Sequence, residues 1–305
     1  MHEPLDFTRT RPWGRPARMT PDILCIGSVL WDVIGRSNAH MHKGSDVPGR
    51  IVRLPGGVAL NIAMAAKAYG MTPALLSVVG RDVEGDELVA ALERLGLVTE
   101  MLYRSEDLPT DVYMAVEGGN GLIAAIADAH SLEAAGDKVL RPLEGLNFTG
   151  PIAVDGNLTQ DLLGQIAADA RFAHADLRIA PASPGKAERL LPFLTHGSAT
   201  LYVNLEEAGL LLHAPQPDAP TAAETLRKRG LHRALVTDGS RTAACAHPGG
   251  VIARMPRSVM VTRVTGAGDT FMAAHIAAEA QGADPAVALD RALEAAATYV
   301  SGDTY

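Results

Sequence analysis

The sequence is poor in cysteine, in basic charge and in long apolar runs, and each shortage narrows what the chain can be. Cys25 and Cys245, the two cysteines among 305 residues, cannot build a disulfide framework, and their apolar surroundings predict reduced core thiols. No run of about 18 uncharged apolar residues occurs, which argues against a membrane-spanning helix. The net charge of −8 and the lack of a basic stripe argue against a nucleic-acid partner.

The first residues also lack an export signal. Residues 1–18 contain arginines but no apolar segment follows them, so we interpret residues 1–20 as a disordered tail and expect a cytoplasmic protein. Met19 directly precedes the first predicted strand and is an alternative start. Residues 21–305 then form the folded domain, which is long enough to bury a sizeable core.

Short apolar runs alternate with helical patterns along most of the chain. This alternation predicts a mainly parallel sheet covered by helices on both faces, with ligands bound beyond the carboxyl ends of its strands. Asp155, Asn204 and Thr237 fall at those ends, and one predicted helix opens with Thr221 and Glu224, the spacing of a capping box. The predicted strands are residues 23–30, 74–80, 151–155, 177–181, 200–204 and 234–240, and the predicted helices are residues 56–70, 84–96, 158–173, 185–194, 221–230, 269–281 and 285–299.

Two stretches interrupt this alternation. Residues 33–55 have no helical period, and residues 110–127 alternate apolar and polar side chains on either side of the turn-forming sequence "EGGNG". Together they predict a small accessory sheet. It is either a lid over the main site or a pair of edge strands without a functional role.

The stretch "VTGAGDTF", residues 264–271, places two glycines directly before a predicted helix. It nearly matches the dinucleotide fingerprint, but Phe271 replaces the third glycine and Asp269 would repel a pyrophosphate. Amides at a helix start favour an anion, and a carboxylate among them suits phosphoryl transfer to an alcohol. Taken alone, the stretch is also compatible with an ordinary turn that carries an acidic residue.

Six stretches, in order and over residues 22–305, resemble the motifs of the ribokinase-like (phosphofructokinase-B) carbohydrate kinases. The resemblance implies an α/β fold with a mainly parallel central sheet between helices and a small β lid. It also implies transfer of a phosphoryl group from ATP to a sugar hydroxyl. The matching stretches are "GSVLWD" (27–32), "GGVALN" (56–61), "VGRDVEG" (79–85), "NLEEA" (204–208), "VTDGSR" (236–241) and "VTGAGDTF" (264–271).

The resemblance assigns catalytic and substrate-binding roles to residues of this chain. Asp269 corresponds to the catalytic base, which accepts the proton of the attacking hydroxyl. The backbone of Gly266, Ala267 and Gly268 corresponds to the anion hole. The residues assigned to the substrate are Asp32, Gly56, Gly57, Asn61 and Asp128.

The same resemblance implies a site for ATP and Mg²⁺. Asn204 and Glu207 correspond to residues that hold magnesium, which usually keeps several of its waters. The residues assigned to the nucleotide are Lys186, Asn204, Thr237 and Gly239. For Lys186, a solvated helix lysine is an equal alternative.

Arg263 departs from the family pattern. The wider family usually has aspartate there, near a site for a monovalent cation, so the resemblance does not extend K⁺ dependence to this chain. One hypothesis is that the guanidinium supplies charge that potassium otherwise gives to the anion hole. The alternative is that Arg263 points to solvent and contributes only its backbone.

Within this family, softer features resemble the kinases that act on pseudouridine, namely "LIAAIAD" (122–128), "VDGNL" (154–158) and "PASPGKAERLLPFL" (181–194). We therefore expect ATP-dependent phosphorylation of the pseudouridine 5′-hydroxyl. A kinase for another ribonucleoside or sugar is the first alternative, and a catalytically silent nucleotide- or sugar-binding protein is the second. By analogy with the family, a homodimer through the lid is expected.

Overall fold

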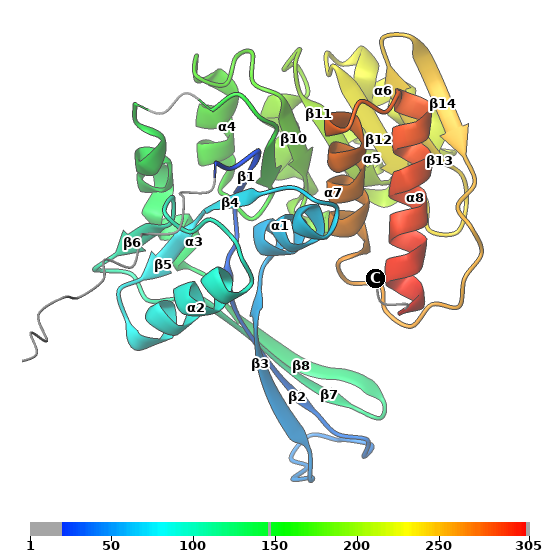
Figure 1. The fold of residues 1–305 in the computed structure, drawn as a ribbon. Helices are drawn as coiled ribbons and strands as arrows, with labels where there is room; N and C mark the ends of the chain where they lie inside the picture. The colour runs from blue at the N-terminus through cyan, green and yellow to red at the C-terminus, as the bar shows by residue number, and fades with distance from the viewer. Residues whose placement is uncertain (1–19, 146–147, 303–305) are drawn as a thin grey trace, which may run out of the picture.

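The computed structural model describes residues 20–145 and 148–302, so the predicted tail lies outside the described residues except for Thr20. A central sheet of eight strands organises the described chain (Figure 1). Its strands, in spatial order, are β14 (Gly250–Arg254), β13 (Ala243–His247), β12 (Arg233–Thr237), β11 (Thr200–Asn204), β10 (Leu177–Ala180), β9 (Ile152–Asp155), β1 (Ile23–Ile26) and β4 (Pro73–Leu76).

The order of these strands marks one position in the sheet as special. Strands β4, β1, β9, β10, β11 and β12 run parallel, while β13 and β14 are antiparallel at one edge. From β1 the chain adds β4 on one side and later adds β9 on the other. The strand order therefore reverses between β1 and β9, and in open α/β sheets the crevice at such a reversal is where ligands bind.

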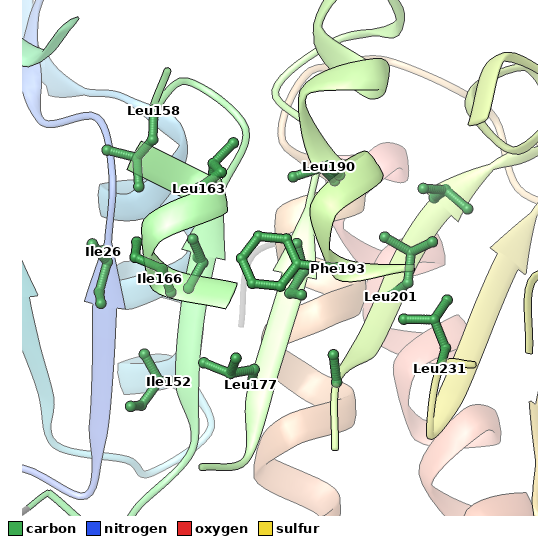
Figure 2. Packing of buried hydrophobic residues seen from close by; sticks show 14 of the residues in the cluster. Ile26, Ile152, Leu158, Leu163, Ile166, Leu177, Leu190, Phe193, Leu201 and Leu231 are labelled. Atoms are coloured by element: carbon green, nitrogen blue, oxygen red, sulfur yellow. The ribbon is translucent and has the colours of Figure 1, made fainter. Parts of the chain in front are cut away.

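Helices cover both faces of the sheet, because its strands carry apolar side chains on both faces. One core lies under α1 (Val58–Ala68), α2 (Val83–Arg94), α7 (Ala267–Ala280) and α8 (Pro285–Ser301). The other core, shown in Figure 2, has Phe193 fully buried at its centre. The elements around this second core are α3 (Ser131–Ala135), η1 (Gly136–Leu143), α4 (Gln160–Ala168), η2 (Pro184–Phe193), α5 (Leu205–Leu212) and α6 (Ala219–Lys228).

A second, four-stranded sheet projects from the body of the molecule (Figure 1). We call it the accessory sheet; its strands, in spatial order, are β3 (Arg50–Gly56), β2 (Leu30–Arg36), β7 (Val112–Gly118) and β8 (Gly121–Asp128). The two stretches that interrupt the strand–helix alternation supply most of its residues. A short pair, β5 (Val78–Gly80) and β6 (Tyr103–Ser105), completes the strands of the described chain.

Several local expectations needed correction. Residues 184–193 form a 3₁₀ helix rather than an α-helix, and Pro192 inside it removes an amide donor. The capping box predicted at Thr221 and Glu224 is wrong, because Asp218 caps α6 and accepts from the Thr221 amide at 2.8 Å. The strand predicted over residues 23–30 ends at Ile26, where the chain turns into the accessory sheet.

The expectation for the cysteines is met within the described residues. Cys25 and Cys245 are both free and buried, and burial raises the pKa of each thiol. No helix in the part of the chain that the structure describes is long and apolar enough to cross a membrane.

Candidate active site

Asp155 lies at the carboxyl end of β9, beside the point where the strand order reverses. Its fully buried carboxylate accepts hydrogen bonds from the amide of Ser28 at 2.7 Å and from the amide of Ala59 at 2.9 Å. The Ser28 hydroxyl and the backbone amide of Asn157 also donate to it, at 3.2 and 2.7 Å. Burial raises the pKa of Asp155, and these hydrogen bonds oppose the rise. Asp155 thus fastens the start of α1 to the end of β1.

Helix α1 has no capping side chain of its own, and two residues from other elements replace it. Asp155 binds the Ala59 amide, and the Ser28 hydroxyl accepts from the Val58 amide at 2.8 Å. These contacts satisfy two of the helix amides that would otherwise lack acceptors. Asp155 was predicted only as a residue at a strand end and was missing from the predicted site residues, because its partners are far away in the sequence.

Gly56 and Gly57 allow two segments to approach each other closely at this edge. A Cβ on Gly56 would overlap the Asp32 carboxylate, and one on Gly57 would overlap the Ser28 carbonyl. Gly57 also has a φ of +107°, which strains any other residue. In this structure the glycines therefore bring Asp32 and the start of α1 together.

Asp269 lies in the first turn of α7 and is half-buried. The Asn61 side chain, from α1, donates a hydrogen bond to its carboxylate at 3.1 Å. Burial raises the pKa of Asp269 to about 7; the Asn61 hydrogen bond opposes this rise, and the charges of Asp155 and Glu207 add to it. A carboxylate with such a pKa can accept a proton near neutral pH, as a general base must.

The loop before α7 presents backbone amides beside this carboxylate. Gly266 caps the helix with a φ of +90°, and its carbonyl accepts from the Thr270 amide and hydroxyl at 3.0 and 2.9 Å. The Ala267 amide is already engaged, because it donates to the Val264 carbonyl at 3.0 Å. Among the described residues no acceptor takes the amides of Gly266, Gly268 and Asp269. Three free amides at a helix N-terminus favour an anion.

Asn204 and Glu207 form a reciprocal capping box at the start of α5. The Glu207 carboxylate accepts from the Asn204 amide at 2.8 Å, and the Asn204 side chain accepts from the Glu207 amide at 2.9 Å. Burial raises the pKa of Glu207, and the neighbouring charge of Glu206 adds to the effect. Thr237 pairs with Asn204 in the sheet register, and Gly239 follows in a turn with a φ of +59°.

The Lys186 side chain points toward the place where the strand order reverses rather than into solvent. Its ammonium donates to the Asn157 side-chain carbonyl at 2.7 Å, and the Asn157 side-chain amide donates to the Ser28 hydroxyl at 2.9 Å. A chain of hydrogen bonds therefore connects Lys186 to the carboxylate of Asp155. It brings one positive charge to a site that otherwise contains several carboxylates.

The accessory sheet separates two of the predicted substrate residues. Asp32 is paired with Tyr113, whereas Asp128 is paired with Val112, one row further along. Because side chains alternate between the faces of a sheet, the side chains of Asp128 and Asp32 lie on opposite faces of the accessory sheet. Its side chain is 72% exposed and contacts His130 at 3.1 Å. Asp32 is half-buried, and burial raises its pKa.

Arg263 lies against the end of helix α8. Its guanidinium carbon is 3.8 Å from the centroid of the Tyr299 ring, and its Nε donates to the Tyr299 carbonyl at 2.8 Å. A cation at this position also complements the negative end of the helix dipole. The side chain is thus engaged by α8 rather than pointing freely into solvent.

Cation-binding capacity at the site rests on its uncompensated carboxylates. Glu207 and Asp269 receive hydrogen bonds only from neutral amides among the described residues. No cluster of three or more His, Cys, Asp or Glu side chains arranged to hold a metal occurs in the described residues. The residues therefore fit a magnesium ion held mainly by phosphate oxygens and water.

Comparison with known proteins identifies the family to which the chain is similar. The model of the pfkB family carbohydrate kinases matches residues 20–303. The pseudouridine kinase of Escherichia coli (strain K12) is 28% identical over 260 residues, which are 82% of this chain and 81% of that protein. The guanosine-inosine kinase of Exiguobacterium acetylicum is 26% identical over 295 residues, or 92% of this chain and 94% of that protein.

A solved structure shows the same architecture. The carbohydrate kinase from Agrobacterium tumefaciens superposes with a TM-score of 0.79 at 27% identity, covering 91% of this chain and 90% of that one. The fold is thus ribokinase-like, with a mixed but mostly parallel sheet between helices. This confirms the fold class expected from the six motifs.

Proposed function

The chain belongs to the pfkB family of carbohydrate kinases, and we propose that within this family it transfers the γ-phosphoryl group of ATP to the 5′-hydroxyl of pseudouridine. Members of this family are phosphotransferases with an alcohol group as acceptor. The proposal therefore concerns the substrate, the residues that act on it and the ions that assist.

The arrangement at the start of α7 carries the proposal. Asp269 lies beside the free amides of Gly266, Gly268 and its own backbone, so a base and an anion site occupy one helix turn. The carboxylate would take the proton of the attacking hydroxyl while the amides stabilise charge on the transferred group. Because Asn61 binds the Asp269 carboxylate, it would hold this base in place as well as contact the substrate.

Two further features support a ribosyl acceptor. The Asp32 carboxylate, held against Gly56, can accept hydrogen bonds from two neighbouring hydroxyl groups of a ribose. The pseudouridine kinase of E. coli, which is 28% identical over most of both chains, supports this nucleoside as an acceptor. The stretch "VDGNL", which resembles the kinases that act on pseudouridine, contains Asp155 and Asn157, which organise the edge of the sheet next to α1.

We assign the nucleotide side of the site to the ends of β11 and β12. Thr237 and Gly239 would line the nucleotide, Lys186 would approach its phosphates, and Glu207 with Asn204 would hold magnesium through water. Magnesium would supply charge neutralisation to the phosphates. The raised pKa of Glu207 makes a nearby cation favourable, because a cation stabilises the ionised carboxylate.

A single assay tests the substrate. ADP release is measured with magnesium and ATP against pseudouridine, uridine, guanosine, inosine, adenosine and ribose, and pseudouridine is expected to give the highest kcat/KM. Rapid turnover of guanosine or inosine instead would favour the second candidate, a purine nucleoside kinase. The similarity to guanosine-inosine kinase is the reason for this alternative. Absence of turnover with every acceptor would leave the protein without its proposed activity.

Arg263 gives an expectation about potassium. Since the guanidinium stacks on Tyr299, whose hydroxyl already binds the loop that precedes α7, we expect activity to differ less than about twofold between K⁺ and Na⁺ salts at equal ionic strength. An increase of severalfold on adding K⁺ over Na⁺ would contradict this expectation.

The accessory sheet supports two proposals about assembly and closure. Ile51, Leu122 and Ile126 are 79%, 61% and 67% exposed, a large apolar surface for a single chain. We propose that this sheet closes over the substrate, excludes water and pairs with a second copy in a homodimer in the cytoplasm. Light scattering tests the dimer: Ile126→Lys should give a monomer, whereas Val251→Lys, on the far edge of the central sheet, should not.

A further inference from the structure

We propose that Tyr299, near the end of α8, is a positioning residue for the anion-binding loop, and that Arg263 holds its ring in place. This inference rests on the proposed function, because it assigns the loop a role in phosphoryl transfer. The Tyr299 hydroxyl donates to the carbonyl of Thr265 at 2.8 Å, and it lies where a Cβ of Gly266 would be. Only glycine at residue 266 leaves room for this contact.

The contact controls one peptide plane of the loop. The Thr265 carbonyl and the Gly266 amide belong to the same trans peptide group, in which they point in opposite directions. Holding the carbonyl toward Tyr299 therefore aims the Gly266 amide away from Tyr299. That amide is one of the three that have no acceptor among the described residues. Tyr299 thus sets the direction of a donor without touching the bound anion.

The next peptide plane is held by a different device. The Gly266 carbonyl accepts from both the amide and the hydroxyl of Thr270, and the Ala267 amide donates to Val264. The loop's own helix thereby fixes the plane after Gly266. The plane before it depends on a side chain from α8, a separate element, which makes Tyr299 the point at which α8 can influence the loop.

Arg263 fixes Tyr299 from the other side. Its guanidinium stacks on the ring at 3.8 Å and donates to the Tyr299 carbonyl, while the Thr262 amide donates to the Val300 carbonyl at 2.8 Å. The planar guanidinium suits such stacking better than a lysine ammonium would. The guanidinium covers the ring while the ring's hydroxyl is bonded to the loop, and both contacts limit the positions of that hydroxyl.

The test removes the hydroxyl and leaves the ring. Tyr299→Phe should lower kcat about tenfold with little change in either KM, a loss smaller than the roughly 10²–10³-fold of deleting a whole anion-hole donor. Affinity for ADP with aluminium fluoride, a mimic of the transferring phosphoryl group, should fall by a similar factor, while affinity for ADP alone should not change. A structural contact would not separate these two affinities.

Two controls make the result specific. Thr262→Val removes the hydroxyl that donates to Val300 at 3.1 Å, so it weakens the same tie between loop and helix without touching the peptide plane. Tyr103→Phe removes a hydroxyl from another tyrosine that has an arginine over its ring, far from this loop. Both variants should keep the kcat of the unmodified protein within about twofold.

Arg263→Met completes the experiment. It should lower kcat less than Tyr299→Phe does, and the double variant should be no slower than Tyr299→Phe alone, because both act through one hydroxyl. The inference is overturned if Tyr299→Phe retains normal kcat, or if Thr262→Val loses as much activity. Failure of the proposed function is a different result, in which the unmodified protein itself phosphorylates none of the acceptors tested.

Discussion

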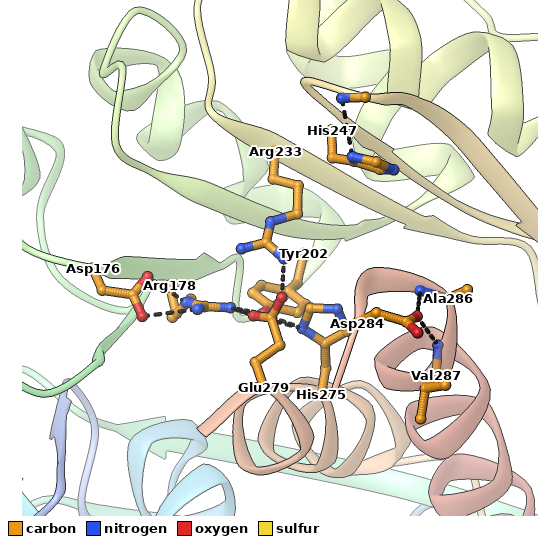
Figure 3. A network of polar contacts seen from close by, with 11 residues as sticks. Asp176, Arg178, Tyr202, Arg233, His247, His275, Glu279, Asp284, Ala286 and Val287 are labelled. Carbon is orange, nitrogen blue, oxygen red and sulfur yellow. Dashed lines mark hydrogen bonds and ion pairs between the residues drawn. The ribbon is translucent and has the colours of Figure 1, made fainter. Parts of the chain in front are cut away.

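The two ends of helix α7 place a carboxylate in opposite surroundings. Asp269, in the first turn, receives one hydrogen bond from a neutral amide and has its pKa raised to about 7. Glu279, in the last turn, is paired with two arginines, Arg178 and Arg233 (Figure 3). Burial alone would raise the pKa of Glu279, but the charges of Arg178, His275 and Arg233 hold it below its usual value.

The contrast distinguishes a functional carboxylate from a structural one. The network around Glu279 also includes Asp176, 2.6 Å from Arg178, and the Tyr202 hydroxyl, which contacts His275 at 2.9 Å. It ties the end of α7 to the amino ends of β10 and β12, roughly 15 Å along the helix from Asp269. The rigid end thereby fixes the helix, while the end near the substrate retains an uncompensated charge that a ligand can use.

The largest expected effect comes from removing the charge at the functional end. Asp269→Asn should lower kcat by roughly 10²–10⁴-fold, because the amide cannot accept the hydroxyl proton. Steady-state ADP release with saturating acceptor measures it, and circular dichroism checks that the variant is folded. A variant with near-normal kcat would remove Asp269 from the role of base.

The structural end should respond in stability instead of activity. Glu279→Gln leaves Arg178 and Arg233 buried without their shared partner, so the free energy of unfolding should fall by about 3–5 kcal/mol. Urea titration measures this loss. The matched control is Glu294→Gln on α8, whose exposed pairing with Arg257 should contribute less than about 1 kcal/mol.

The kinetics of the same variants sharpen the comparison. At urea concentrations below its unfolding midpoint, Glu279→Gln should keep kcat within about threefold of the unmodified protein, because other contacts hold the start of α7. Equal stability of the Glu279→Gln and Glu294→Gln variants would show that the buried network does not anchor α7. A collapse of kcat in a folded Glu279→Gln variant would show that the two ends are not separable.

Much of the fold could be predicted because the signals are local. The apolar runs that became β9, β10 and β11 are short and bounded by polar residues, and each helix over them shows its own period. The strand order could not be predicted, since nothing local states that β1 lies between β4 and β9. The 3₁₀ helix at residues 184–193 was missed because its apolar spacing resembles that of an α-helix.

The candidate site divides in the same way. Asp269 and the glycines before it could be predicted, because one short stretch contains base and amides together. Asp155 and Glu279 could not, because their roles depend on partners such as Ala59 and Arg178, which are 96 and 101 residues away. In sequence, Glu279 is an ordinary acidic residue of a helix; only the tertiary structure surrounds it with arginines.

A smaller effect is expected in the pH profile of the free enzyme. Since the base must be deprotonated and burial raises its pKa to about 7, kcat/KM should rise up to tenfold per pH unit below about 7 and then level off. Asn61→Ala removes a hydrogen bond that lowers this pKa, so the rise should move to higher pH. A profile that is flat between pH 6 and 8 would contradict the assignment.

The smallest effect concerns stability at the functional end. The pKa of Asp269 rises from 3.8 to about 7 on folding, so the native protein binds this proton more tightly than the unfolded chain does. The carboxylate therefore costs stability as pH increases from about 4 to 7. Asp269→Asn lacks this cost, so its melting temperature should match that of the unmodified protein at pH 4.

At pH 8 the same variant should melt a few degrees higher than the unmodified protein, because it lacks this cost. Differential scanning calorimetry at both pH values gives the comparison, and Asp290→Asn on the exposed face of α8 serves as the control without a pH-dependent gain. If the melting temperature of Asp269→Asn at pH 8 were equal to or below that of the unmodified protein, other groups would already compensate the charge of this carboxylate. The two ends of α7 would then differ in position but not in charge balance.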